Sequence, residues 1–390
     1  MPLLLLLSIA AFVSAFTIRM IDPLVPAIGR DLGVPVETAA LLASAYTFPY
    51  ALAQPVLGTI GDALGKALVI KVCLAVLAVS LALGAVATTY EYLFAARMLA
   101  GIAGGGIIPV SFALIGDRFS IADRQWALSR LVMASQVAIL LGTACGGLVA
   151  TQIGWRPMFV FPAVLAAITF VLTMLALPAR ERTARPKINA ASVKAGYAET
   201  LSSPWALVCL TCVFLEGVAM NGLTPFIAAR MEQRGLGTLT DAGLALGAMS
   251  LGGIGFTLLV RQLLGLLGRA WLVRVGGILV ALSLGGVAYS TSWQMEAACL
   301  FVNGFGFFMV HNSLQAIGTE LAPNARGSGV AMFAFVFFMG QAIGPVLYST
   351  LFTALGPHVP IVLGGLTILA VGIWFGRRLQ AADAALPGRG

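Results

Sequence analysis

Charged residues are scarce in this chain, and their scarcity excludes most classes of protein. Only 10% of the 390 residues are charged and two are histidines, whereas 59% are hydrophobic. In soluble domains roughly a quarter of all residues are charged, so a soluble fold is excluded. Because a helix of about 20 apolar residues crosses a bilayer, the mean hydropathy of +0.98 predicts a polytopic membrane protein.

Groups that carry out catalysis or bind metals are also few. The five cysteines all fall in apolar stretches, and the pair Cys209 and Cys212 has no second pair or nearby histidine to complete a metal site. No nucleophile stands beside a base, and there is no phosphate-binding loop. We therefore expect no enzyme, no metal, no cofactor and no ATP-driven pump in this chain.

The basic residues follow the loops and do not form a nucleic-acid-binding face. Most of the 23 Lys and Arg fall in predicted inner loops and tails, so the net charge of +8 follows the positive-inside rule. This pattern predicts cytoplasmic termini and a multi-pass protein of the cell inner membrane, with the lipid bilayer as partner and no nucleic acid. The apolar N-terminus lacks a basic leader and is interpreted as an uncleaved first span.

Twelve apolar stretches are separated by short polar breaks, and one longer basic segment, 178–203, lies near the middle of the chain. LGKALVIKV at 64–72 returns 203 residues later as LGRAWLVRV at 267–275. We therefore predict an all-α fold of 12 transmembrane helices in two pseudo-symmetric six-helix bundles, 1–177 and 204–390, with 178–203 as a cytoplasmic linker. The predicted spans are 3–28, 38–60, 67–88, 92–116, 125–151, 155–177, 204–229, 241–263, 270–290, 293–318, 327–352 and 357–377.

Three motifs accompany this repeat. One is Gly58-x-x-Gly61-Asp62-x-x-Gly65-Lys66 between the second and third spans, and another is Arg97-x-x-x-Gly101-x-x-Gly104 in the fourth. With the repeat and the linker, they make the whole chain resemble the major facilitator superfamily. The first span, with Asp22-Pro23, is similar to the 12-span drug/proton antiporter branch. LLGTACGGLVA at 140–150 resembles the antiporter motif of the fifth helix, but Thr143 stands where that motif has proline.

The turn after the second span is the predicted gate. Its glycines let two helices approach closely, and Asp62 would lie near the start of the eleventh helix, after Arg326, where a helix N-terminus favours an anion. An acid there would latch one transport state. The alternative is an ordinary polar loop with helix-capping glycines. The gating candidates are Gly58, Asp62, Gly65, Lys66 and Arg326.

Charges inside the spans point to function, because they are costly in hydrocarbon. Arg19 and Asp22 share one helix face. Asp22 and Arg97 fall about 9 Å from the ends of their helices, so we expect a direct pair. The resemblance assigns Arg97 a role in proton coupling. Asp22 is then the candidate proton carrier, and the alternative is a permanent structural cluster.

Glu216 falls near the midplane, and no basic residue is predicted at similar depth in the C-terminal half. It would carry a proton or bind a cationic substrate, or, in the alternative, donate one structural hydrogen bond as a neutral acid. His311 lies deeper, and histidine is the residue type whose charge ordinarily changes near physiological pH, although a lone histidine in a helix is more often structural.

Few other polar side chains fall at mid-depth, which favours a lipophilic substrate over a sugar, whose unpaired hydroxyls would be expensive. The candidate substrate-binding residues are Tyr46, Tyr50, Gln136, Asn221, Asn303, His311, Asn312 and Gln341.

The function that these observations predict is proton-coupled efflux of small amphiphilic compounds by alternating access, with the proton gradient as driving force. The resemblance implies a monomer. One alternative is uptake of a metabolite such as an organic acid, held by Arg19 and Arg97. Another is a receptor, which would bind without flux.

Overall fold

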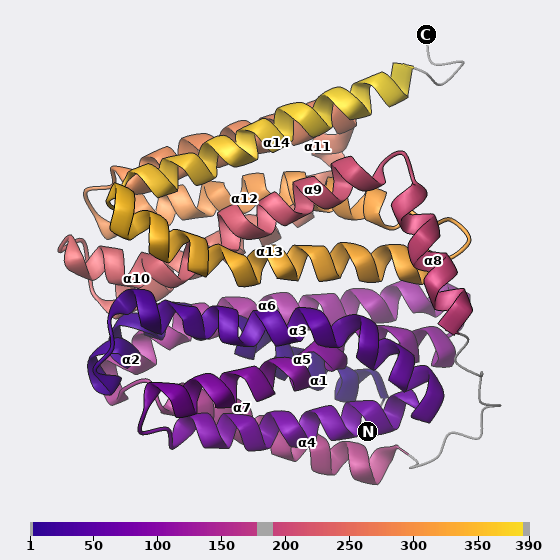
Figure 1. Ribbon diagram of the computed structural model, residues 1–390, viewed down its shortest axis with the longest axis horizontal. Helices are drawn as coiled ribbons and strands as arrows, with labels where there is room; N and C mark the ends of the chain where they lie inside the picture. Colours follow the sequence, from indigo (N-terminus) through magenta and orange to yellow (C-terminus); the bar gives the residue numbers. More distant parts are fainter. Residues whose placement is uncertain (1–2, 178–189, 385–390) are drawn as a thin grey trace. The chain divides into compact units, whose positions relative to one another are not determined.

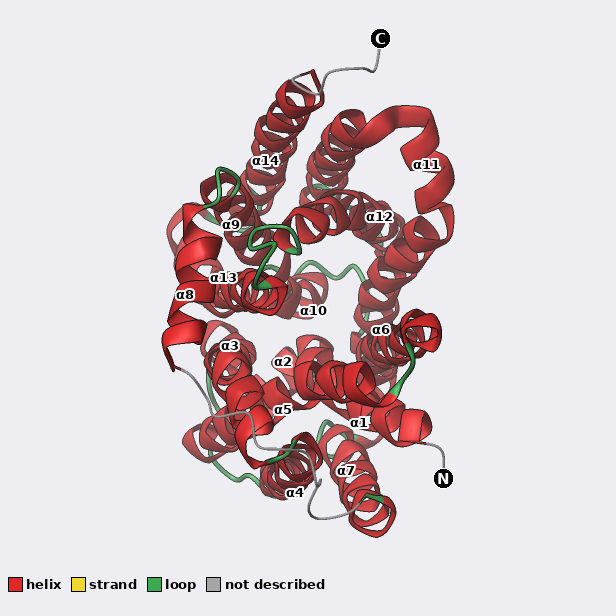
Figure 2. Cartoon of the chain, turned by 90° about the vertical axis from the view of Figure 1, so that its right-hand side faces the viewer, coloured by secondary structure: helices red, strands yellow, loops and turns green. Residues whose placement is uncertain are grey.

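The computed structural model describes residues 3–177 and 190–384, except for the side chains at 59, 62, 63, 121, 122 and 190–193. Within these residues every regular element is helical, as Figure 2 shows in red. Ten helical runs are long and apolar enough to cross a membrane. One of them, α11 (Leu239–Ala288), has 50 residues and breaks at Gly268, so it contains two spans. With α3 (Val36–Leu64), at the predicted second span, the twelve-span all-α fold is confirmed.

The chain forms two compact units. The first comprises Met1–Ala190 with Pro225–Glu232 and Thr238–Gly243, and the second comprises the remainder. Residues 178–189 of the predicted linker lie outside the described residues, and the predicted domain boundaries stay predictions. The remaining helices of the N-terminal half are α1 (Leu3–Arg19), η1 (Asp22–Leu24), α2 (Val25–Leu32), α4 (Lys66–Ala85), α5 (Tyr90–Arg118), α6 (Ile121–Ile153) and α7 (Pro157–Ala176).

The C-terminal half begins with a helix that the linker contributes. This helix, α8, packs on the start of α13: the Glu199 carboxylate accepts hydrogen bonds from the backbone N–H and the side-chain Nδ2 of Asn324, at 3.1 and 3.2 Å. The elements of this half, besides α11, are α8 (Ala190–Ser202), α9 (Ala206–Glu216), η2 (Gly217–Asn221), α10 (Thr224–Gln233), α12 (Trp293–Gly318), α13 (Arg326–Leu355) and α14 (Val359–Ala384).

Neighbouring helices within each unit run side by side (Figure 1). In the first unit, α5 packs against both α3 and α4, while α1 lies along α6 and α4 along α7. In the second, α13 packs against α9 and η2, and α14 packs against α9. Each half therefore buries apolar helix faces against its own helices.

Two spans are interrupted where the sequence analysis expects continuous helix. In the first span α1 ends at Arg19, η1 follows at Asp22–Leu24, and α2 starts at Val25. Pro23 and Pro26 supply no backbone N–H, so the helical hydrogen bonds cannot run through this stretch. In the seventh span α9 ends at Glu216 and passes into the π-helix η2. Both breaks lie at ionisable residues singled out from the sequence.

The turns between spans repeat from one half to the other. Every described residue with positive φ is a glycine, the residue that takes this conformation without steric cost. These glycines form three pairs separated by 202 or 203 positions: Gly33 and Gly235, Gly65 and Gly268, and Gly154 and Gly356.

Helix starts and close contacts repeat at the same spacing. The Thr89 and Ser292 hydroxyls accept hydrogen bonds from the third residue of α5 and α12, both at 3.3 Å, which caps N–H groups that have no helical partner. A Cβ at Gly101 would overlap the Tyr46 carbonyl oxygen, and one at Gly304 would overlap that of Met249. Each member of these pairs lies 203 positions from its equivalent, so the two halves share one plan.

Candidate functional site

The break in the first span holds an acid and a base. Arg19, the last residue of α1, donates from Nη1 to Asp22 Oδ2 at 3.5 Å, and the Asp22 side chain is 1% exposed. Because the helix stops between them, both side chains lie where the backbone is irregular. Irregular backbone at membrane depth is tolerated where protein buries it. Here the irregular backbone carries Asp22, the carboxylate that the sequence analysis singles out.

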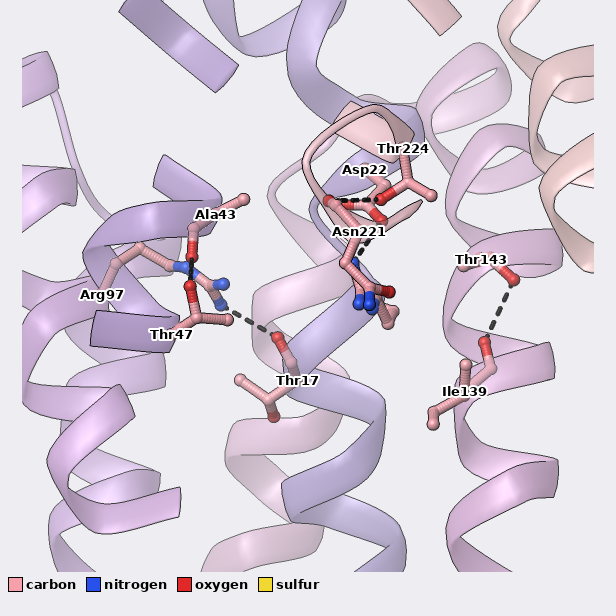
Figure 3. Close-up of polar contacts among 10 residues, drawn as sticks. Thr17, Asp22, Ala43, Thr47, Arg97, Ile139, Thr143, Asn221 and Thr224 are labelled. Atoms are coloured by element: carbon pink, nitrogen blue, oxygen red, sulfur yellow. Dashed lines mark hydrogen bonds and ion pairs between the residues drawn. The ribbon is translucent and has the colours of Figure 1, made fainter. Parts of the chain in front are cut away.

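Arg97 lies nearby on α5 but binds different partners from those expected. Its Nε donates to the Leu42 carbonyl at 3.2 Å and its Nη1 to the Thr17 carbonyl at 3.0 Å, the second of which Figure 3 shows. The predicted direct Asp22–Arg97 pair is therefore wrong. Arg97 ties α5 to α3 and α1 through backbone oxygens, because a guanidinium offers a rigid fork of donors.

Tyr46 completes this cluster. The Arg97 guanidinium lies over its ring, 4.4 Å from the centroid, and its hydroxyl donates to the Ser14 carbonyl at 3.5 Å. Tyr50 stacks on it with ring centroids 5.7 Å apart. Both tyrosines are buried, so in this structure they pack the interior of the first unit.

In the second unit Glu216 meets His311. Glu216 Oε2 lies 2.8 Å from His311 Nδ1, and the carboxylate is fully buried while the histidine is 12% exposed. The expectation that Glu216 has no basic neighbour is therefore wrong. Depths counted along ideal helices from their ends ignore helix tilt.

Four phenylalanine rings surround His311. Their centroids lie 4.7 to 6.3 Å from the imidazole centroid, and the rings come from α12 and α13. The four are Phe307, Phe308, Phe333 and Phe337. We call them the phenylalanine cage. The second Glu216 oxygen, Oε1, is buried and has no hydrogen-bond partner among the described residues.

Glycines set the position of the cage relative to Glu216. A Cβ at Gly217 would overlap the Phe337 carbonyl oxygen, and one at Gly340 would overlap that of Phe214. Backbone contact between α9–η2 and α13 therefore requires glycine at both positions. Gly340 and Gly344 are spaced as Gly-x-x-x-Gly, a spacing typical of close helix contacts, whereas their partners Gly217 and Gly222 are five residues apart and lack this spacing.

The other predicted binding residues are dispersed over the two units. Asn303 donates to Ser283 Oγ at 3.2 Å and is buried. Asn221 lies buried on η2, where its carbonyl accepts from Thr224 at 3.2 Å (Figure 3). Gln341 is buried on α13, whereas Gln136 on α6 and Asn312 on α12 are half-buried. Their role in substrate binding stays a prediction.

The residues of the predicted gate occupy the junction of α3 and α4. Lys66 Nζ lies 2.5 Å from Asp117 Oδ2 at the end of α5. The sequence analysis did not predict this pair, although an acid at the end of the fourth span was visible as a possible partner for Lys66. Gly65 has φ 105° and makes the turn, and Gly58 lies about two helical turns before it on α3. Arg326 is exposed at the start of α13. The Asp62 side chain lies outside the described residues.

Among the described residues no group of three or more His, Cys, Asp or Glu is placed to hold a metal ion. Thr143, which departs from the motif, donates to the Ile139 carbonyl at 3.0 Å within α6 (Figure 3).

Comparison with known proteins agrees with the motifs. A sequence model of the Major Facilitator Superfamily matches residues 7–345, with a second match at 212–389. An uncharacterized MFS-type transporter of Bacillus subtilis, YwfA, is 23% identical over 99% of this chain and 96% of its own length. Multidrug resistance protein 1 of the same species is 24% identical over 93% of this chain and 92% of its own.

A solved structure has the same fold. It is a bacterial homologue of the human lysosomal transporter Spinster, in an inward-facing and unoccupied conformation. The TM-score is 0.81 at 14% identity, over 99% of this chain and 98% of the other. This likeness supports the helical architecture alone.

Proposed function

The chain belongs to the Major Facilitator Superfamily, and on this premise we propose that it is a proton-coupled secondary transporter that exports small amphiphilic compounds. Such a transporter exposes one site to alternate sides of the membrane. The relative named a multidrug resistance protein supports export, and the apolar character of the buried side chains favours amphiphilic substrates.

The observation that carries the proposal is the buried Asp22 carboxylate at the break of the first span. Asp22 is the proton carrier, and Arg19 is the group that responds to its charge. When Asp22 takes up a proton, its ion pair with Arg19 at 3.5 Å loses its attraction, and the guanidinium is held less tightly in its position. Protonation thus favours one conformation over another, which is the condition for driving a two-state transporter.

Arg97 holds the surrounding helices in place. Its bonds to the Leu42 and Thr17 carbonyls do not change when Asp22 takes up a proton, because backbone oxygens do not titrate. It also keeps a second positive charge in the cluster. We therefore assign Arg97 to the electrostatic setting of Asp22 and not to proton transfer.

The test uses proteoliposomes with a panel of amphiphilic dyes of positive, zwitterionic and negative charge. Wild-type protein is expected to move at least one dye against its gradient when a pH gradient is imposed. Asp22→Asn is expected to reduce this driven transport at least about tenfold while it retains dye exchange at equal pH, since exchange needs no net proton movement. Asp383→Asn, which changes a half-exposed acid, is the matched control.

Two results would overturn the proposal. Equal driven transport by wild type and Asp22→Asn would remove Asp22 from coupling. Dye exchange by the wild type without any response to the pH gradient would remove proton coupling altogether.

Uptake of an organic acid is the second candidate function, and one observation favours it. Arg97 Nη2 is buried and has no hydrogen-bond partner among the described residues, so it could donate to a carboxylate. The sign of substrate-induced proton movement separates the candidates. A symporter takes up protons together with its substrate, whereas an exporter takes up protons as its substrate leaves.

A further inference from the structure

Glu216 and His311 form a buried pair that the proton step at Asp22 does not use. We propose that Glu216 and the phenylalanine cage form a binding site for lipophilic ammonium ions, and that His311 occupies this site until the ligand displaces it. The inference rests on the proposed transport function and names a substrate class for it.

The first argument is the charge at the centre of the site. Glu216 is fully buried, and its Oε1 has no hydrogen-bond partner among the described residues. A buried carboxylate is costly unless a cation or donors compensate for its lost hydration. His311 binds one of its two oxygens at 2.8 Å, so compensation is incomplete and a fully charged ligand would improve it.

The second argument is the geometry around the imidazole. The cage rings Phe307, Phe333 and Phe337 have their centroids 5.2, 5.8 and 4.7 Å from that of His311. A cation is attracted to an aromatic face within about 6 Å of its centroid. A trimethylammonium head at the position of the imidazole would therefore lie within range of three rings and beside the carboxylate.

The third argument is access. His311 is the exposed member of the pair, at 12%, whereas Glu216 is fully buried. A ligand therefore meets His311 first, and rotation of this side chain uncovers Glu216. Since α12 carries His311 while α9 carries Glu216, the histidine can move without displacing the acid or the glycine contacts that position it.

The choice between a cation and a neutral apolar ligand follows from these facts. A neutral ligand would bury the same rings but leave Glu216 uncompensated once His311 had moved. A ligand that carries a positive charge restores the pair. The site therefore selects charge together with apolar surface.

The test is equilibrium dialysis of radiolabelled benzyltrimethylammonium with purified full-length protein in detergent, without a pH gradient. Glu216→Gln is expected to weaken binding at least about tenfold, and Phe337→Leu about threefold, the sizes that follow from losing a charge partner and one aromatic face. His311→Ala is expected to tighten binding at least about threefold, because the competing side chain is gone. Glu320→Gln, an exposed glutamate just past α12, is the matched control.

His311→Ala makes the result decisive, because a histidine that merely supports the site or binds the ligand would weaken binding on removal. The proposal is overturned if His311→Ala weakens binding, if Glu216→Gln binds as wild type does, or if neither wild type nor His311→Ala binds the probe. Neopentylbenzene, the uncharged isostere, should compete at least about tenfold less well, and equal competition would reduce the site to an apolar pocket.

The assay separates this inference from the proposed function. Binding that depends on Glu216 in a protein that shows no proton-driven transport would retain the site and reject the coupling. Proton-driven transport of dyes with no Glu216-dependent binding would retain the coupling and reject the site. Size-exclusion profiles and unfolding curves of each variant show whether it is folded.

Discussion

The two halves share a backbone plan, but the buried acid of each half has different neighbours. In the N-terminal half, one acid lies with two arginines, and Arg97 binds backbone carbonyls. In the C-terminal half, one acid lies with a single histidine inside a ring of phenylalanines. The glycine turns, the helix caps and the closest backbone contacts recur at a spacing of 202 or 203 residues, whereas Asp22, Arg97, Glu216 and His311 have no acidic or basic equivalent at that spacing. The two halves thus share the features that folding needs and differ in the residues of their sites.

The two halves differ in the base near the buried acid, and substitution of that base is expected to have the largest effect on the free energy of unfolding. Arg97→Met is expected to cost about 3 kcal/mol or more, because the Leu42 and Thr17 carbonyls lose their donor and Asp22 loses a neighbouring positive charge. His311→Phe is expected to cost about 1 kcal/mol, since one hydrogen bond to Glu216 is lost while the new ring fits the cage. Equilibrium unfolding in mixed detergent–SDS micelles measures both. Equal losses would mean that the two clusters have the same structural role.

The repeated backbone contact should respond alike in both halves. Gly101→Ala and Gly304→Ala each place a Cβ against a carbonyl oxygen of a neighbouring helix, and overpacking of this kind costs about 1–3 kcal/mol. The same unfolding assay measures them. Gly116→Ala on α5, where a Cβ meets nothing within 4 Å, is the control and should leave stability unchanged or slightly raise it. A large loss in one half only would contradict the shared plan.

The smallest expected effect is at the repeated caps. Thr89→Ala and Ser292→Ala each remove a side-chain acceptor for the third residue of the following helix. Each is expected to cost about 1 kcal/mol. Restoration by Thr89→Ser and by Ser292→Thr would show that the hydroxyl is responsible. A loss in both alanine variants that neither exchange restores would assign the effect to packing.

Much of the fold was predictable because it follows from local properties. Span length and hydropathy fix where helices cross, and the repeat at 64–72 and 267–275 predicts two related halves. Gly65 and Gly268 are turn glycines because only glycine takes positive φ freely. The cluster of Arg19, Asp22 and Arg97 was also visible, since charges are so rare within the apolar stretches.

The partners within the sites were not predictable by the same route. Arg97 was expected to bind Asp22, yet its Nη1 donates to the Thr17 carbonyl, an acceptor that every residue possesses and that no pattern marks. His311 was placed too deep to reach Glu216, because counting residues along a helix ignores helix tilt.

The sequence by itself therefore determined the number of spans, the internal repeat and the few ionisable residues within the apolar stretches. These depend on hydropathy and backbone conformation, which act over a turn or two of helix. Only the tertiary structure decided that Arg97 ties helices together through backbone oxygens and that Glu216 meets His311 within a cage of phenylalanines. Such pairings depend on how helices distant in the chain cross, and glycine contacts such as that between Gly217 and α13 set those crossings.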